Sequence, residues 1–181
     1  LSEGSQCRSF GRNADGFIDA EGVGAVILKP LSHALRDGDN IHAVIKGSAL
    51  NAGGRTHGYS VPNPVAQADV VSSALARAKV DAADVGYIEA HGTGTALGDP
   101  IEIAGLTRAF AASRRAAADG SAARQYCAIG SLKSNMGHCE SAAGIAALSK
   151  VLLQLKHRQL VPTLHCDDVN DEIDFSKTPF H

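Results

Sequence analysis

The sequence predicts an α/β fold built in layers, and three observations lead to this expectation. Short apolar runs typical of strands alternate along the chain with stretches of helical periodicity. The 181 residues are enough for one domain of ordinary size, or a large piece of a bigger one, and no internal repeat interrupts the alternation. Alanine and glycine contribute 30 and 19 residues, whereas aromatic residues make up only 4%. This composition predicts a core that relies on close packing of small side chains.

The first third of the chain is predicted to contain two strands around a short helix. Residues 23–28 are a continuous aliphatic run, which indicates a buried strand. Residues 31–36 form a helical turn that ends at the DGDN cluster of 37–40. Residues 41–50 alternate in hydropathy, so we expect a second strand antiparallel to the first. The glycine-rich stretch 51–59 predicts an irregular loop that could face a substrate.

Two helices begin at recognisable capping residues. Asn63 is a good N-cap, it is followed by a proline, and apolar residues at helical spacing continue over 63–80. A second helix, ending near residue 112, is predicted to start at Asp99 as N-cap, with Glu102 completing an arrangement like a capping box. Capping alone would account for both carboxylates.

The remaining elements complete the alternation. Residues 86–90 and 127–132 predict short strands, and residues 113–124 predict a solvated loop or frayed helix. Residues 140–156 predict a helix that is small or apolar nearly all round, which is typical of a helix buried on most sides. Residues 160–161 predict a last short strand, cut by a proline.

Charge and cysteine content exclude several classes of protein. A net charge of −2 argues against nucleic-acid binding, and no apolar run is long enough to cross a membrane. The four cysteines show no CxxC spacing, which favours a reducing, cytoplasmic location and no disulfide framework. Two adjacent His-Cys pairs have a spacing unlike that of a zinc site, so no metal is expected. The chain opens on Leu1 rather than methionine, which suggests a piece of something longer.

Two histidines stand in matching contexts. His91 and His138 each stand in a glycine-containing turn between a short strand and a helix, a position where α/β sheets present side chains to ligands. Either residue alone is more often an ordinary loop histidine, but two of them in matching contexts favour a functional role. Lys133 is either a solvated lysine or a cation that orients carboxylates and tunes the imidazoles. Thr93 and Thr95 could bond an amide-bearing ligand or the backbone of their own turn.

The blocks "EAHGTGTALGDPIE" and "GSLKSNMGHCESAAGIAALSK" resemble the two signature blocks of the β-ketoacyl synthase family. The segment "CRSFGRNADGFIDAEGVGAVILKPL" resembles the one that precedes them. The resemblance implies a thiolase-like layered α-β-α-β-α fold, incomplete in this chain, that works as a homodimer. Residues 1–60 would be the end of the N-terminal half, and residues 61–181 would form most of the C-terminal half with both histidine motifs.

The resemblance also implies an activity and its site residues. Family members catalyse a decarboxylative Claisen condensation, in which His91 and His138 match the two histidines that hold the enolate oxygen. Lys133 matches the family lysine, with Glu102 as the expected carboxylate partner and Asp99 in support. The acyl-accepting cysteine of the family stands in a TACSSS-like context that none of the four cysteines has, so we expect it upstream of this chain, which by itself would be inactive.

The same resemblance implies partners. Thr93 and Thr95 match positions that contact phosphopantetheine, so acyl groups would arrive on an acyl carrier protein and no bound cofactor is needed. Other expected partners are the remainder of the domain and a second copy. "GYSVPNP" and Glu140 favour polyketide synthases of the trans-acyltransferase type. The alternatives are a non-catalytic docking or scaffold segment and a fatty-acid synthase condensing enzyme, the latter disfavoured by "GYSVPNP".

Overall fold

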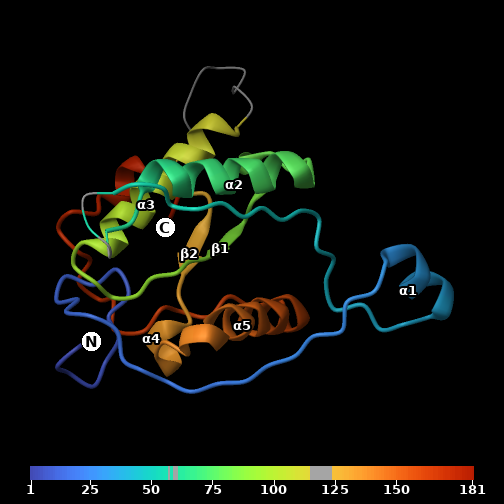
Figure 1. The fold of residues 1–181 in the computed structure, drawn as a ribbon, viewed down its shortest axis with the longest axis horizontal. Helices are drawn as coiled ribbons and strands as arrows, with labels where there is room; N and C mark the ends of the chain where they lie inside the picture. Colours follow the sequence, from blue (N-terminus) through green and yellow to red (C-terminus); the bar gives the residue numbers. More distant parts are fainter. Residues whose placement is uncertain (57, 59–60, 115–123) are drawn as a thin grey trace.

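The chain forms a layered α/β body and a long extended arm, which we define as residues 23–50 (Figure 1). The computed structural model describes residues 1–56, 58, 61–114 and 124–181. Strands β1 (Tyr87–Glu89) and β2 (Ala128–Gly130) lie parallel at the centre, with Ile88 opposite Ile129. Helices α2 (Pro64–Ala78) and α3 (Gly98–Ala112) cover one face, and α4 (Lys133–Met136) and α5 (Ala143–His157) lie on the other. The predicted layered α/β architecture is confirmed.

The helix predicted to begin at Asn63 has the expected cap. The Asn63 side chain accepts hydrogen bonds from the backbone N–H groups of Val65 (3.0 Å) and Ala66 (3.2 Å), and Pro64 occupies the first helical position. Such a cap satisfies donors that the first turn leaves without intrahelical partners. Three 3₁₀ turns complete the secondary structure of the described residues: η1 (Ala82–Asp84), η2 (Glu140–Ala142) and η3 (Phe175–Lys177). Together η2 and α5 confirm the helix predicted over 140–156, whereas α4 was not predicted.

The two strands predicted in the first third are wrong. Residues 23–28 and 41–50 are extended but belong to no strand, and they carry α1 (Leu31–Asp37) away from the body (Figure 1). Their apolar side chains are exposed, Val23 by 99% and Ile27 by 97%. An apolar run becomes a strand only when another strand offers its edge, and none of the described residues pairs with this arm. Residues 160–161 form no strand for the same reason.

Two predicted loops extend beyond the described residues. Residues 51–56 are irregular as expected, whereas residues 57 and 59–60 lie outside the described part of the chain. In the loop predicted over 113–124, Ser113 ends α3, and residues 115–123 are outside the described part.

Aromatic side chains contribute more to the core than the composition predicts. Phe110 and Phe180 are buried with ring centroids 5.0 Å apart, and Phe10 packs edge-on against Phe175 at 6.4 Å. These rings fill the space between the strands and α3, together with Ile103, Leu106 and Ile173. A few large rings therefore supply much of the buried apolar area that small residues cannot.

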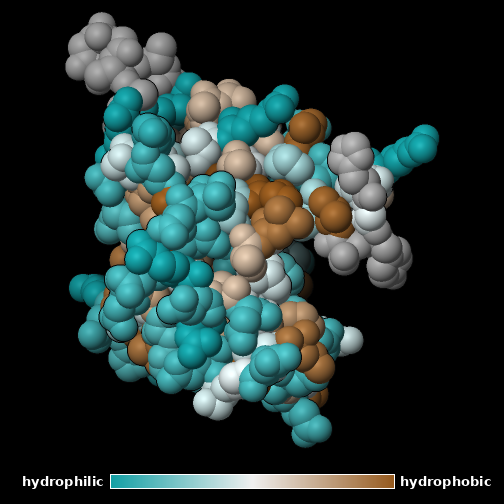
Figure 2. Space-filling view, turned by 90° about the vertical axis from the view of Figure 1, so that its left-hand side faces the viewer, coloured by the Kyte–Doolittle hydropathy of each residue, from teal (hydrophilic) through white to brown (hydrophobic). Residues whose placement is uncertain are grey.

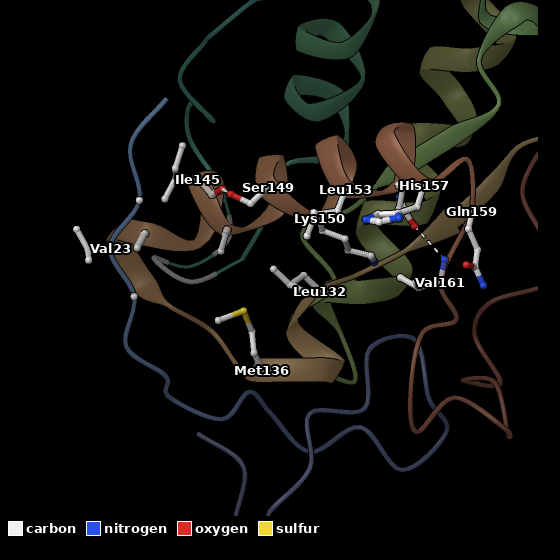
Figure 3. A pocket seen from close by; sticks show the side chains of 15 residues that line it. Val23, Leu132, Met136, Ile145, Ser149, Lys150, Leu153, His157, Gln159 and Val161 are labelled. Atoms are coloured by element: carbon white, nitrogen blue, oxygen red, sulfur yellow. Dashed lines mark hydrogen bonds between the residues drawn. The ribbon is translucent and has the colours of Figure 1, made fainter. Parts of the chain in front are cut away.

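Helix α5 is less buried than predicted. Its two buried residues are Lys150 and Gln154, while Leu153 and Leu155 remain 54% and 55% exposed. Apolar side chains of α5 line an open groove of about 470 Å³, closed on one side by residues 22–24 (Figure 3). The side of the body away from the arm is mainly hydrophilic, with apolar side chains showing in separate patches (Figure 2).

Candidate active site

His91 is positioned by a tight turn directly after β1. Gly92 has a φ of +45°, and a Cβ added there would lie 2.6 Å from the Cβ of Ser131. The Ser131 hydroxyl lies 3.2 Å from the carbonyl oxygens of both His91 and Gly92, so it can donate to either. Only glycine allows this close approach in a left-handed conformation. The turn therefore packs the backbone of His91 against Ser131, the residue that follows β2.

His138 is positioned by a second glycine turn, directly after α4. Gly137 has a φ of +86°, and a Cβ there would lie 2.8 Å from the carbonyl oxygen of Ile18. The backbone N–H of His138 donates to that same oxygen at 2.7 Å, and the His138 carbonyl accepts from the N–H of Ala20 at 3.0 Å. Residues 18–20 of the N-terminal segment thus bond the backbone of His138 on both sides and fix its position.

The structure brings the two imidazole rings together. Their centroids are 5.4 Å apart and their planes are nearly perpendicular, at 86°. The Phe17 ring packs on His138 with a centroid distance of 5.0 Å. Two side chains 47 positions apart in sequence are therefore neighbours in the fold.

Hydrogen bonds determine which nitrogen of each ring carries the proton. The backbone N–H of Glu140 points at Nδ1 of His138 from 2.9 Å, so this Nδ1 acts as an acceptor. The Lys133 ammonium, which can only donate, lies 3.4 Å from Nδ1 of His91. In both rings the proton of the neutral form is consequently on Nε2.

The surroundings of the rings favour the neutral form. Desolvation by neighbouring atoms, with smaller contributions from the charges of Lys133 and His138, lowers the pKa of His91 to about 4, although the residue is exposed to solvent in this chain. Burial and the charge of Lys133 also lower the pKa of His138. At pH 7 each ring therefore offers a neutral Nε2–H donor, the kind of group that can stabilise an oxyanion.

We expect His91 to stay neutral at a pH where an ordinary histidine is largely charged. In ¹⁵N-histidine NMR spectra of the intact domain, with His91 assigned through His91→Gln, its ring should titrate at about 4. Free histidine in the same buffer should titrate near its usual value of about 6.5. A midpoint for His91 close to that of free histidine would contradict the proposed environment.

Lys133 links the two turns. Its ammonium donates to the carbonyl oxygen of His91 at 2.7 Å, and its side chain is buried, which lowers its pKa. The carboxylates of Glu102 and Glu89 act in the opposite direction and raise that pKa. Because Lys133 begins α4, which leads into the His138 turn, its contact with His91 ties both turns together.

Glu102 and Asp99 do not cap α3, so that prediction is wrong. The N-cap is Leu97, without a side-chain hydrogen bond. The two oxygens of Glu102 accept the backbone N–H groups of His91 (2.7 Å) and Gly92 (2.8 Å). The buried Asp99 carboxylate accepts the N–H of Phe10 at 2.7 Å, and burial raises the pKa of both acids. Glu102 therefore bonds the turn that carries His91, and Asp99 bonds the N-terminal segment at Phe10.

The two threonines lie on the same loop as His91. Their hydroxyl oxygens are 3.3 Å apart, and that of Thr95 accepts the backbone N–H of Gly98 at 3.1 Å. Thr95 therefore satisfies its own turn, as one of the two interpretations predicts. Thr93 is partly exposed, and a hydroxyl can form more than its one contact with Thr95.

Comparisons with known proteins agree with this geometry. The model of the β-ketoacyl synthase C-terminal domain matches residues 42–167, and that of the β-ketoacyl synthase N-terminal domain matches residues 1–34. The chain belongs to the β-ketoacyl synthase family. Its fold is accordingly the thiolase-like fold of ketosynthases, of which it covers the C-terminal part.

The chain is similar to short stretches of much longer polyketide synthases. It is 58% identical over 180 residues to polyketide synthase PksM of Bacillus subtilis, covering 99% of this chain and 4% of that protein. It is 58% identical over 182 residues to polyketide synthase ThaG of Burkholderia thailandensis, covering 99% of this chain and 3% of the relative. The segment thus spans a small fraction of the curated relatives it matches.

Solved ketosynthases share its structure. The oxazolomycin ketosynthase domain OzmH KS7 of Streptomyces albus is 52% identical with a TM-score of 0.92. The ketosynthase from module 6 of the bacillaene synthase of Bacillus subtilis 168 is 39% identical with a TM-score of 0.93. In both cases the match covers 100% of this chain and 31% of the solved one.

Some residues that hold the turns of His91 and His138 were not singled out from the sequence. Ser131 bonds the turn of His91. Glu89 bonds the backbone of Leu132, the residue before Lys133. Glu89 opens the first quoted signature block, two residues before His91, which is the one sequence signal that could have indicated it. Within the described ranges, no group of three or more His, Cys, Asp or Glu side chains could hold a metal ion. In the same ranges, no helix is long and apolar enough to span a membrane.

Proposed function

We propose that this chain is the histidine-bearing part of a ketosynthase that performs decarboxylative Claisen condensation in polyketide biosynthesis. The observation that carries the proposal is the pair of neutral imidazoles, 5.4 Å apart, with both Nε2–H groups free of the bonds that occupy Nδ1. The family and its polyketide synthase relatives support the reaction type.

The reaction requires a site that binds a developing negative charge. When a malonyl thioester loses CO₂, the electrons of the broken C–C bond move toward the thioester and leave negative charge on its oxygen. The Nε2–H donors of His91 and His138 would bond that oxygen and stabilise the enolate. The carbanion then attacks the carbonyl of an acyl-cysteine thioester, the cysteine thiolate leaves, and a β-ketoacyl chain remains on the carrier.

The nucleophilic cysteine is proposed to lie outside these residues. Burial raises the pKa of Cys7, Cys127 and Cys166, and for Cys127 to about 11, whereas an attacking thiol needs a low pKa. Cys139 is buried against the backbone of the N-terminal segment. By this proposal the chain alone is inactive and needs the remainder of the domain.

The proposed partners follow from the same chemistry. Phosphopantetheine on an acyl carrier protein would deliver the substrates along Thr93 and Thr95. The exposed apolar side chains of the arm fit contact with the remainder of the domain, and a second copy would complete a homodimer. The four cysteines are free, which fits a cytoplasmic protein.

We further propose that the synthase is of the trans-acyltransferase type. The support is "GYSVPNP" at 58–64 and Glu140 after the second histidine motif. Of that heptapeptide, residues 58 and 61–64 belong to the described part of the chain. A domain of this type should accept extender units loaded onto its carrier protein by a separate acyltransferase.

Incubation of the intact ketosynthase domain with substrates tests the function. With an acyl thioester and a malonyl-loaded carrier protein, mass spectrometry should find the carrier bearing a β-ketoacyl chain and an equal amount of released CO₂. A folded domain that neither becomes acylated nor releases CO₂ would favour a docking or scaffold segment. Preference for a fatty-acid synthase carrier over polyketide carriers would point to the fatty-acid alternative.

A further inference from the structure

A buried polar cluster connects β1 to α5. We define it as Tyr87, Glu89 and Lys150. The Lys150 ammonium lies 2.8 Å from Oε2 of Glu89, and these side chains are only 5% and 7% exposed. The Tyr87 hydroxyl donates to the same Oε2 at 2.6 Å, and burial followed by this bond raises the pKa of Tyr87. The carboxylate is thus surrounded by donors from β1 and α5.

The second oxygen of Glu89 connects this cluster to the active site. Oε1 accepts the backbone N–H of Leu132 at 2.6 Å. Leu132 directly precedes Lys133, whose ammonium bonds the carbonyl of His91. Glu89 itself stands two residues before His91 on the strand that leads into its turn. One carboxylate therefore sets the distance between the end of β1 and the start of α4.

Lys150 holds that carboxylate from the opposite side. Its side chain leaves α5 on the side of Leu132, while neighbouring apolar side chains of the helix face the groove (Figure 3). One turn further on, Oε1 of Gln154 accepts the N–H of Val161 at 3.1 Å. The buried contacts of α5 are thus polar ones, directed at the strands and at the segment after the helix.

Stability alone does not account for a buried ion pair here. Removing two charges from water is costly, and well-packed apolar side chains of similar volume stabilise a fold as well or better. A carboxylate bonded on both oxygens does, however, hold its partners at defined distances, which apolar packing does not. What it fixes in this fold is the backbone between the two histidine turns.

We propose that Glu89 and Lys150 are positioning residues for the condensation: their ion pair fixes the N–H of Leu132 and thereby holds Lys133 against His91. The proposal rests on the function proposed above for His91 and His138. The contacts of these two residues described above go to each other, to Tyr87 and to Leu132 rather than to an imidazole. Their effect is transmitted through Leu132 and Lys133.

The double variant Glu89→Gln/Lys150→Met in the intact domain tests this role. It leaves no charge unpaired, so the domain should remain folded, whereas either single change would bury an uncompensated charge. We expect the kcat of condensation to fall by about 10- to 100-fold, with KM for the malonyl-carrier and the rate of cysteine acylation unchanged. Lys177→Met, which breaks an exposed ion pair to Asp174, is the matched control and should change none of these quantities.

A second readout does not depend on catalysis. Desolvation is the main cause of the low pKa of His91, and the positive charge of Lys133 lowers that pKa further. If the double variant releases Lys133, the NMR titration midpoint of His91 should rise. A folded double variant with an unchanged midpoint and unchanged kcat overturns the proposal, as does a parallel loss of acylation and condensation. A raised midpoint in a domain that never condenses would support the positioning role and refute the proposed function.

Discussion

Replacing His91 or His138 by alanine in the intact domain should lower the rate of condensation by about 100- to 1000-fold, the usual effect of losing one oxyanion donor. The two rings lie 5.4 Å apart and by our proposal bond the same oxygen, so losing either one removes a donor that the other cannot replace. Acylation of the cysteine involves a different oxyanion and should continue. The measurement is single-turnover formation of the β-ketoacyl product beside mass-spectrometric detection of the acyl-enzyme.

His33→Ala provides the matched control for these two variants. His33 is an exposed histidine on α1, the helix that the arm carries away from the strands (Figure 1). It should retain both partial reactions. Unchanged condensation in His91→Ala or His138→Ala would show that the imidazoles do not hold the enolate. Loss of acylation together with condensation would instead place them in the first half of the reaction.

Replacing Gly92 by alanine should have the largest effect on stability, a loss of about 2–4 kcal/mol in the free energy of unfolding. The new Cβ would lie 2.6 Å from the Cβ of Ser131 and 3.1 Å from the Phe10 ring, at a φ of +45°. Both neighbours are buried, so the turn itself must move. Because His91 and its bonds to Glu102 are part of this turn, condensation should fall as well. Urea unfolding and the condensation assay measure the two effects.

Gly86→Ala separates this effect from a general intolerance of the region. Gly86 precedes β1, six positions earlier, and an added Cβ there would meet nothing within 4 Å. We expect its free energy of unfolding to stay within about 0.5 kcal/mol of the unsubstituted domain. Equal unfolding free energies for the two variants would mean that the Gly92 turn can relax without cost.

Local chemistry made part of the site predictable from sequence. Asn63 followed by proline defined the start of α2, because a cap depends on a few consecutive residues. The glycines beside His91 and His138 indicated turns, since only glycine readily takes the positive φ found at Gly92 and Gly137. The resemblance to β-ketoacyl synthases implied that both histidines bond one oxygen, and their rings lie 5.4 Å apart.

Contacts between distant segments could not be predicted in the same way. The pattern at Asp99 and Glu102 suits a cap, but the turn of residues 91–92 and the backbone of Phe10 approach from outside and take up the carboxylates. Glu89 and Lys150 are separated by 61 positions, and nothing near either residue indicates an ion pair.

The sequence by itself determined the alternation of helices and strands, the two glycine turns and the residues that could bear chemistry. All of these depend on near neighbours along the chain, where capping and backbone conformation are decided. Only the tertiary structure decided the partners: which carboxylate holds which N–H, and that residues 23–28 and 41–50 find no strand to join within the described part of the chain. A strand needs another strand's edge and a buried charge needs its counter-charge, and both come from residues far away in sequence.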